Sequence, residues 1–360
     1  MLAQISSVAA YLPQDRLDNA ALAKVFPKWT PEKISRKLGI DVRPVADKNE
    51  TAVDLAVCAA QRLFQEGLAR RDQIDFVILC TQSPDYFLPT SACLLQDRLG
   101  LPKTCGAFDI NLGCSGYVYG LSVAKGLIES RVAKKVLFIT SETYTKYINP
   151  EDRVTRPLFG DGAAATLLEA VDVPAATCEQ SNDVFSRHAT LGPFEFGTDG
   201  SGAELLMVQA GAARMTATPE TKIPVVAATG NYNSREELFM HGAGIFNFSI
   251  EVVPELVKRF DAMTQAHGER VDAYIFHQAN KFMLDRLREL CDVPEEKFYN
   301  NMQTRGNTVS SSIPIALIDA MRDGKLHPGD LALLVGFGVG LSWGACLARL
   351  PETFRVASLR

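Results

Sequence analysis

The residues best suited to chemistry stand in a glycine-rich turn, Gly113-Cys114-Ser115-Gly116. Residues 108–112 before it predict a short buried strand, and the apolar spacing from Tyr117 onward predicts a helix. Glycines permit the sharp strand-to-helix turn that would aim the Cys114 sulfur outward at the helix N-terminus. The helix dipole and unpaired backbone N–H groups there favour a thiolate. For this cysteine alone, a small buried side chain is an equally good interpretation.

An internal repeat connects Cys114 with two distant residues. Asp75-Phe-Val-Ile-Leu-Cys matches Asp272-Ala-Tyr-Ile-Phe-His277, and a helix follows each segment. A glycine turn comes next in both halves, Gly113-Cys114 in the first and Gly306-Asn307 in the second. Two halves packed about a pseudo-two-fold axis would place Cys114 and Asn307 at equivalent helix starts, with His277 at the end of a strand. Ligands collect at such strand ends in α/β folds.

The rest of the chain alternates strands with helices, which indicates an α/β protein. We expect an N-terminal half with the nucleophile over 1–172, a loop-rich connection over 173–235, and a C-terminal half with the His and Asn over 236–360. Gly197-Thr-Asp-Gly-Ser-Gly in the connection lacks the Gly-Lys-Ser/Thr ending of a phosphate-binding loop. Turns and hairpins are the better interpretation of these glycines.

Composition excludes several classes of protein. The 360 residues are 47% apolar and carry a net charge of −5, which argues against generic binding to nucleic acid or to an anionic membrane. We see no signal-peptide pattern and no apolar run that could span a bilayer. The eight cysteines form no Cys-x-x-Cys pair, so we expect a cytoplasmic protein with neither a disulfide framework nor a metal site; they are Cys58, Cys80, Cys93, Cys105, Cys114, Cys178, Cys291 and Cys346.

Taken together, the motifs resemble those of the thiolase superfamily and, within it, the β-ketoacyl-acyl carrier protein synthase III family. The resemblance runs from about residue 2 to 350. It is carried by Gly113-Cys-Ser-Gly116, Phe159-Gly-Asp-Gly-Ala-Ala, His277-Gln-Ala-Asn280, Gly306-Asn-Thr-Val-Ser-Ser-Ser-Ile-Pro314 and Gly338-Val-Gly-Leu-Ser-Trp-Gly344. It implies a thiolase-like duplicated five-layer α-β-α-β-α fold, found as a homodimer. It also implies no permanently bound cofactor.

The implied reaction has two steps. Cys114 takes an acyl group from an acyl-coenzyme A, as a thioester exchange requires of a soft nucleophile that also leaves well. Decarboxylative condensation with malonyl-acyl carrier protein follows. By resemblance, the backbone N–H groups of Cys114 and Gly340 hold the tetrahedral oxyanion, and His277 Nε2 with the Asn307 amide holds the enolate oxygen. A Cys-His-Asn set also occurs in thiol proteases, but the repeat and the glycine motifs favour the thiolase pattern.

The same resemblance implies contacts with the substrate. They are Phe87 and Leu88 in a lid that reaches the partner subunit, Arg153 on the coenzyme, Gly242 and Phe246 beside the pantetheine channel, and Ala279 and Asn280 in the His-Gln-Ala-Asn motif. Lys33 and Lys37 stand where the family has a coenzyme-gripping Trp and Arg, and Trp29 lies four residues before the expected place of that Trp. The donor is therefore either an acyl-coenzyme A or an acyl carrier protein.

Two other functions stay open at this point. One is a same-fold acyltransferase that moves the acyl group to an oxygen or nitrogen of a small molecule. The other is a non-catalytic scaffold, against which the intact Cys114, His277 and Asn307 argue. We expect the remaining histidines to have surface or loop roles; they are His188, His241, His267 and His327.

Overall fold

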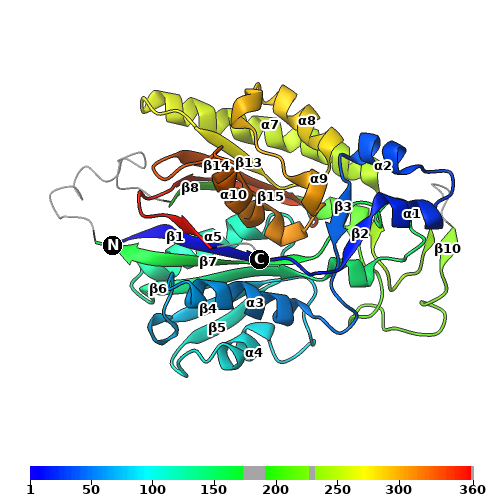
Figure 1. Ribbon diagram of the computed structural model, residues 1–360, viewed down its shortest axis with the longest axis horizontal. Helices are drawn as coiled ribbons and strands as arrows, with labels where there is room; N and C mark the ends of the chain where they lie inside the picture. Colours follow the sequence, from blue (N-terminus) through cyan, green and yellow to red (C-terminus); the bar gives the residue numbers. More distant parts are fainter. Residues whose placement is uncertain (173–190, 227–231, 358–360) are drawn as a thin grey trace.

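Five alternating layers of helices and sheets make up the computed structural model, which describes residues 1–172, 191–226 and 232–357 (Figure 1). Cys178 and His188 lie outside the described residues. One outer layer holds α3 (Ala52–Gln65) and α4 (Ser91–Arg98), the middle layer α5 (Gly116–Glu129) and α10 (Ser312–Arg322), and the other outer layer α7 (Gly242–Ala266) and α8 (Lys281–Leu290). The predicted α-β-α-β-α fold is confirmed.

Two sheets separate the helical layers. The first has the order β16-β1-β7-β6-β4-β5 and the second β13-β14-β15-β8. The strands of the first sheet are β1 (Leu2–Tyr11), β4 (Phe76–Cys80), β5 (Gly106–Ile110), β6 (Lys135–Glu142), β7 (Gly162–Val171) and β16 (Arg355–Val356). Those of the second are β8 (Leu191–Thr198), β13 (Ala273–Phe276), β14 (Leu331–Gly338) and β15 (Ser342–Arg349).

Strand pairing confirms the internal repeat. In the first sheet β4 pairs in parallel with β6, β6 antiparallel with β7, and β7 antiparallel with β1. In the second sheet β13 pairs in parallel with β14, β14 antiparallel with β15, and β15 antiparallel with β8. Even the parallel partner of β4, which is β5, has a counterpart in an isolated bridge between Tyr274 and Phe298.

The repeat corrects one expectation from the sequence. Residues 191–198 do not fit the loop-rich connection predicted over 173–235, because they form β8, the counterpart of β1 in the second sheet. Leu191 is followed closely by Pro193 and by glycines, which are uncommon in strands, so the sequence did not indicate β8. Gly197 in β8 and Gly344 in β15 leave room for aromatic side chains, since a Cβ on Gly197 would lie 2.1 Å from the Trp343 ring.

Short elements surround the core at one end of the molecule (Figure 1). They are β2 (Arg16–Asp18), α1 (Asn19–Val25), α2 (Pro31–Leu38), β3 (Val42–Pro44), β9 (Leu206–Met207), β10 (Val225–Val226), β11 (Tyr232–Asn233), β12 (Phe239–Met240) and α9 (Met302–Arg305). Helix α2 begins and ends as its sequence predicts. The Thr30 side chain accepts a hydrogen bond from Lys33 N, and Gly39 ends the helix in the left-handed conformation.

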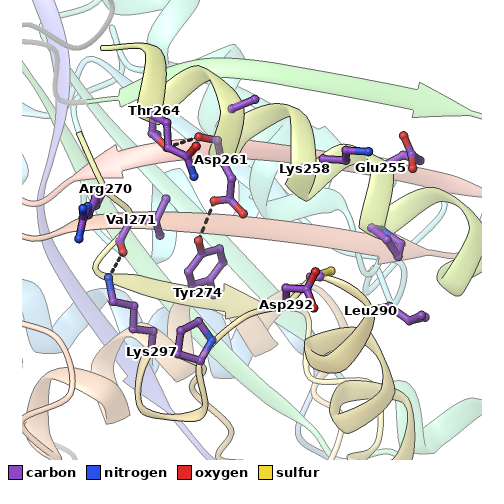
Figure 2. Close-up of a pocket in the computed structure, with 15 residues that line it drawn as sticks. Glu255, Lys258, Asp261, Thr264, Arg270, Val271, Tyr274, Leu290, Asp292 and Lys297 are labelled. Atoms are coloured by element: carbon purple, nitrogen blue, oxygen red, sulfur yellow. Dashed lines mark hydrogen bonds between the residues drawn. The ribbon is translucent and has the colours of Figure 1, made fainter. Parts of the chain in front are cut away.

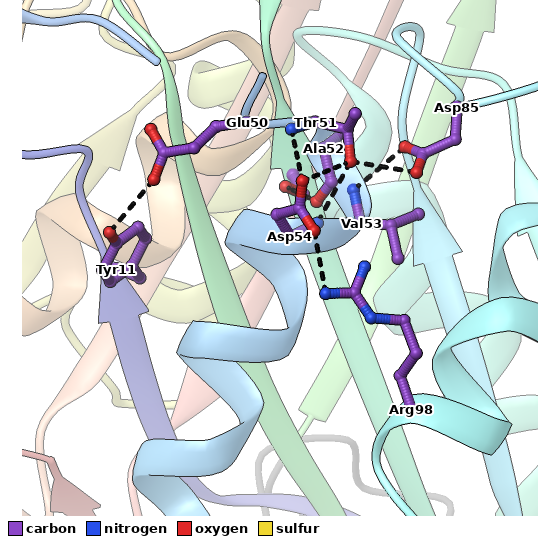
Figure 3. A network of polar contacts seen from close by, with 9 residues as sticks. Tyr11, Glu50, Thr51, Ala52, Val53, Asp54, Asp85 and Arg98 are labelled. Atoms are coloured by element: carbon purple, nitrogen blue, oxygen red, sulfur yellow. Dashed lines mark hydrogen bonds and ion pairs between the residues drawn. The ribbon is translucent and has the colours of Figure 1, made fainter. Parts of the chain in front are cut away.

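The loop that carries Phe87 and Leu88 is tied to the start of α3 (Figure 3). Asp85 accepts hydrogen bonds from the Thr51 hydroxyl at 2.9 Å and from Val53 N at 3.3 Å. Thr51 and Asp54 also form a capping box, and Arg98 pairs with Asp54 at 2.8 Å. One threonine therefore stabilises both the helix and the base of this loop.

We predict that Thr51→Ala lowers the free energy of unfolding by about 1–2 kcal/mol, because it removes an N-cap hydrogen bond and the Asp85 contact. Urea denaturation at fixed protein concentration measures the change. Thr90→Ala is the matched control, since Thr90 precedes α4 without a side-chain capping bond. Equal losses in the two variants would contradict the role of Thr51.

Candidate active site

Cys114 lies between the end of β5 and the start of α5, in a space that only glycines leave open. A Cβ on Gly116 would lie 2.4 Å from Cys80 Sγ, and a Cβ on Gly338 would lie 2.8 Å from Cys114 Sγ. Gly338 has a φ of 154° and comes from the second half of the chain. The two halves therefore meet at the cysteine with no room for a methyl group between them.

The environment of the thiol differs from the one predicted. Cys114 is only 5% exposed, so its sulfur does not point outward. Burial raises the pKa of Cys114 to about 12. A hydrogen bond with the backbone of Val339 lowers this pKa by less than burial raises it, and the charge of Glu142 raises it further. Desolvation outweighs the helix N-terminus here. Burial therefore favours the thiol, and it opposes the thiolate that the helix N-terminus was expected to favour.

His277 follows β13 and is held as a neutral imidazole. Burial lowers the pKa of His277 to about 3. A hydrogen bond with the backbone of Val309 acts in the opposite direction and raises this pKa by less. Its Nδ1 lies 2.7 Å from the Ser312 hydroxyl, which accepts Gln278 N–H at 3.4 Å. A Ser312 hydroxyl that donates to Nδ1 places the ring hydrogen on Nε2. Nε2–H is then the group that His277 offers to a ligand.

Asn307 is fixed through its carbonyl oxygen, which leaves its amide nitrogen for the cavity. Its Oδ1 accepts Val309 N–H at 2.9 Å, and its Nδ2 makes only a long contact of 3.5 Å to Ala279 O. Val309 adopts a left-handed φ of 53° to make this bond. Asn307 lies two residues before a 3-10 turn over Val309–Ser311 that runs directly into α10, and Cys114 likewise lies two residues before α5, as the repeat predicted.

The three residues line one small apolar cavity of ≈ 60 Å³. Three of the predicted substrate contacts, Gly242, Ala279 and Asn280, line it as well. The other lining residues are Leu158, Phe159, Leu206, Met240, Ile245, Met283, Phe337 and Gly338. Leu206 and Met240 come from β9 and β12, which pair with each other. The glycine-rich segment over 197–221 thus contributes a wall of the cavity, a role that its sequence did not indicate.

Other predicted residues lie away from the cavity lining. Phe87 and Leu88 are 85% and 82% exposed on their loop. Arg153 is exposed, and Phe246 stacks on the exposed Phe282 with ring centroids 5.4 Å apart. Lys37 Nζ lies over the Trp29 ring, 5.8 Å from its centroid. Two residues that the sequence analysis named are therefore in contact.

Gly340 is also displaced from its predicted place. It is exposed and does not line the cavity. Leu341 and Asp199 exchange backbone hydrogen bonds at 2.9 Å, which hold the chain away from the cavity at this point. The backbone of Val339, next to Gly338, is the one that hydrogen-bonds the Cys114 thiol. Val339 therefore replaces Gly340 as the candidate for the second backbone donor.

A wider groove of ≈ 870 Å³ lies on the outer face between α7 and the α8 end (Figure 2). Some of its polar groups bond to one another or to the backbone: Tyr274 donates to Asp261 at 2.6 Å, and Lys297 donates to Val271 O at 2.6 Å. None of the three predicted catalytic side chains lines it. Within the described residues, no group of three or more His, Cys, Asp or Glu side chains could hold a metal ion, and no helix is long and apolar enough to cross a membrane.

Glu142 is a site residue that the sequence analysis missed. It ends β6, is fully buried, and accepts hydrogen bonds from Ser310 Oγ at 2.8 Å, Ser83 Oγ at 3.0 Å and Gln82 N at 3.1 Å. Burial raises the pKa of Glu142 to about 8. The sequence feature that could have indicated Glu142 is a charged residue directly after the mostly apolar run Val136–Ser141. Through Ser310, Glu142 connects the Asn307 turn to the cysteine's half.

The duplicated five-layer fold, with a cysteine before a helix between the two sheets, defines the thiolase class. Residues 108–183 match the family model described as 3-oxoacyl-[acyl-carrier-protein (ACP)] synthase III, and residues 263–350 match the model of its C-terminal part. The β-ketoacyl-[acyl-carrier-protein] synthase III of Clostridioides difficile strain 630 is 35% identical over 347 residues, which cover 96% of this chain and 98% of that protein.

Solved structures agree with the sequence match. A crystal structure of a 3-oxoacyl-(acyl-carrier-protein) synthase III has a TM-score of 0.90 and 46% identity, over 97% of this chain and 100% of that one. A synthase from Burkholderia xenovorans LB400 has a TM-score of 0.85 and 32% identity, over 100% of this chain and 97% of that one. This chain belongs to the β-ketoacyl-acyl carrier protein synthase III family, and it is an acyltransferase of this ketosynthase type.

We predict that stability depends on pH through Glu142. The folded protein keeps this proton up to a pKa of about 8, whereas the unfolded chain releases it near 4.5. The stabilisation is complete below pH 4.5 and is lost as pH rises to 8, with a slope of up to about 1.4 kcal/mol per pH unit. Urea denaturation between pH 5 and 8 should show this slope in the difference between the wild type and Glu142→Gln, because other shifted groups such as His277 contribute equally to both proteins.

Glu151→Gln, which changes an exposed carboxylate, is the control and should keep the wild-type slope. A wild-type profile parallel to that of Glu142→Gln would contradict the prediction.

Proposed function

We propose that this enzyme transfers an acyl group from a coenzyme A or carrier-protein thioester to Cys114, and then condenses it with malonyl-acyl carrier protein. The observation that carries the proposal is the cavity that Cys114 shares with His277 and Asn307. It offers one nucleophile from the first half and two neutral donors from the second. No permanently bound cofactor takes part.

In the first step the Cys114 sulfur attacks the thioester carbonyl carbon. The thiol proton is lost as the bond forms, and it ends on the departing sulfur of the donor. The Val339 hydrogen bond and the start of α5 stabilise the charge that develops on the cysteine. We assign the backbone N–H groups of Cys114 and Val339 to the oxyanion of the tetrahedral intermediate.

In the second step malonyl loses carbon dioxide and becomes an enolate. His277 Nε2–H and the Asn307 amide donate to its oxygen, and both are neutral, so they add no charge to an apolar cavity. The enolate carbon attacks the acyl carbonyl, and the Cys114 thiolate leaves and regains a proton. A carboxylate at position 307 would repel the enolate, which explains the need for an amide there.

We predict that Cys114→Ala abolishes acyl labelling by an acyl-coenzyme A panel, because it removes the only atom that forms the thioester. Intact-protein mass spectrometry gives the mass increase directly. Cys93→Ala is the matched control, since Cys93 is an exposed cysteine on α4 and should leave labelling unchanged. Persistent labelling of Cys114→Ala would refute the assignment.

We predict that His277→Ala and Asn307→Ala still accept the acyl group but lose about 10²–10³-fold in condensation rate, the effect of one oxyanion donor. Pre-acylated enzyme mixed with malonyl-acyl carrier protein isolates this step, with released carbon dioxide as the readout. His327→Ala, on an exposed side chain, is the control.

The two variants also distinguish other mechanisms. Condensation at the wild-type rate in both would favour transfer of the acyl group to an oxygen or nitrogen of a small molecule instead. A block of acylation itself would make His277 the base for Cys114.

We further propose a cytoplasmic homodimer without nucleic-acid or membrane partners. Tyr86, Phe87 and Leu88 form an exposed apolar loop whose base Asp85 fixes. Such a patch needs cover, and the lid of a second copy's site suits it. Arg153, with Trp29 and Lys37, is the proposed surface for the phosphates and base of coenzyme A. Light scattering at micromolar concentration should give the mass of a dimer, and a monomer would contradict the proposal.

A further inference from the structure

Gln82 is held at both ends beside the nucleophile. Its backbone N–H donates to Glu142 Oε2 at 3.1 Å, and its side-chain Oε1 accepts the Tyr144 hydroxyl at 3.0 Å. Among the described residues, its amide nitrogen Nε2 donates to no protein group. The fold therefore presents two amide hydrogens in a fixed place and leaves them unused, although a glutamine side chain is ordinarily free to rotate.

The amide lies against the turn that carries Cys114. A Cβ on Gly113 would meet Gln82 Oε1 at 2.5 Å and Val339 Cγ1 at 2.8 Å. Gly113 precedes the nucleophile, and the backbone of Val339 hydrogen-bonds its thiol. Gln82 is half-buried, and the atom that faces Gly113 is its Oε1.

Tyr144 ties the amide to the cavity. Its side chain is only 4% exposed, and its ring lies 5.3 Å from that of Phe159, which lines the cavity. The charge of Cys114 adds to the effect of burial in raising the pKa of Tyr144. Both observations place the Gln82–Tyr144 pair around the nucleophile on the side of the first half.

We place the acyl group on Cys114 on that side for a steric reason. His277 and Asn307 enter the cavity from the second half, and the proposed enolate occupies the space in front of them. An entirely apolar chain packed over Gln82 would strip water from the free amide without replacing its hydrogen bonds, which is unfavourable. An acyl chain with an oxygen atom in reach would satisfy it.

We propose that Gln82, oriented by Tyr144, selects an acyl group that carries a hydroxyl or carbonyl oxygen close to the thioester. Gln82 Nε2–H donates to that oxygen, and no bond is made or broken in the contact. The inference rests on the proposed function, since it requires Cys114 to accept the acyl group.

Competition for Cys114 tests this specificity. Wild-type enzyme is mixed with equal concentrations of butyryl-coenzyme A and 3-hydroxybutyryl-coenzyme A, and initial labelling is read by intact-protein mass spectrometry. We expect the hydroxylated chain to be favoured by about tenfold, the effect of one neutral hydrogen bond. 3-Oxobutyryl-coenzyme A should show the same direction, because its oxygen accepts equally well.

Variants separate the amide from its surroundings. Gln82→Leu keeps the size of the side chain and should abolish or reverse the preference, while butyryl labelling is retained. Tyr144→Phe leaves the amide in place without its anchor and should weaken the preference. Gln96→Leu removes an amide of similar burial on α4 and should keep the wild-type ratio. Thermal unfolding of each variant checks that it is folded.

The outcomes are distinct. A wild-type preference for butyryl, or an unchanged ratio in both Gln82→Leu and Tyr144→Phe, would overturn the inference and make Gln82 a brace for the turn. Absence of labelling by any of the three donors would instead count against the proposed function itself. Should Gln82→Leu fail to fold, the ratio in Tyr144→Phe decides.

Discussion

Two glycines of β14 let the two halves of the chain approach each other closely, and the site depends on this contact. A Cβ on Gly336 would lie 2.8 Å from Ser115 Cα, and one on Gly338 would lie 2.7 Å from Cys114 Cβ. Strand β14 can therefore run directly against the turn before α5. Because of this contact, the Val339 backbone reaches the cysteine of the other half, and a nucleophile and two donors from distant sequence positions share one cavity.

Burial then sets the charge state of the whole site. The same desolvation raises the pKa values of Cys114 and Glu142 and lowers that of His277, so each group is biased toward its neutral form. Hydrogen bonds act within this limit by orienting the groups. Ser312 orients the ring of His277, Val309 fixes the amide of Asn307, and Glu142 fixes Gln82 and Ser310. A neutral cavity suits reactions in which charge appears only in the transition state.

The alternation of elements indicated an α/β protein, the repeat grouped Cys114, His277 and Asn307, and the resemblance of the motifs implied the five-layer fold. The strand predicted over residues 108–112 corresponds to β5, and the helix predicted from Tyr117 onward corresponds to α5. β8 was missed because its membership in a sheet depends on pairing with β15, which is remote in sequence. The burial of the thiol was missed for a similar reason. A turn sequence reveals the helix start near Cys114, but it does not reveal how completely other segments cover the thiol.

Val309 shows what the arrangement costs. A β-branched residue in the left-handed region is strained by about 1–3 kcal/mol, and here that conformation lets Val309 N–H hold the Asn307 carbonyl oxygen. Glycine would relieve the strain, but it would also let the turn relax. The protein thus trades thermodynamic stability for precision at this one turn. Attempts to engineer a more heat-resistant enzyme would gain most from other loops, because a relaxed turn at 309 would loosen the asparagine that it orients.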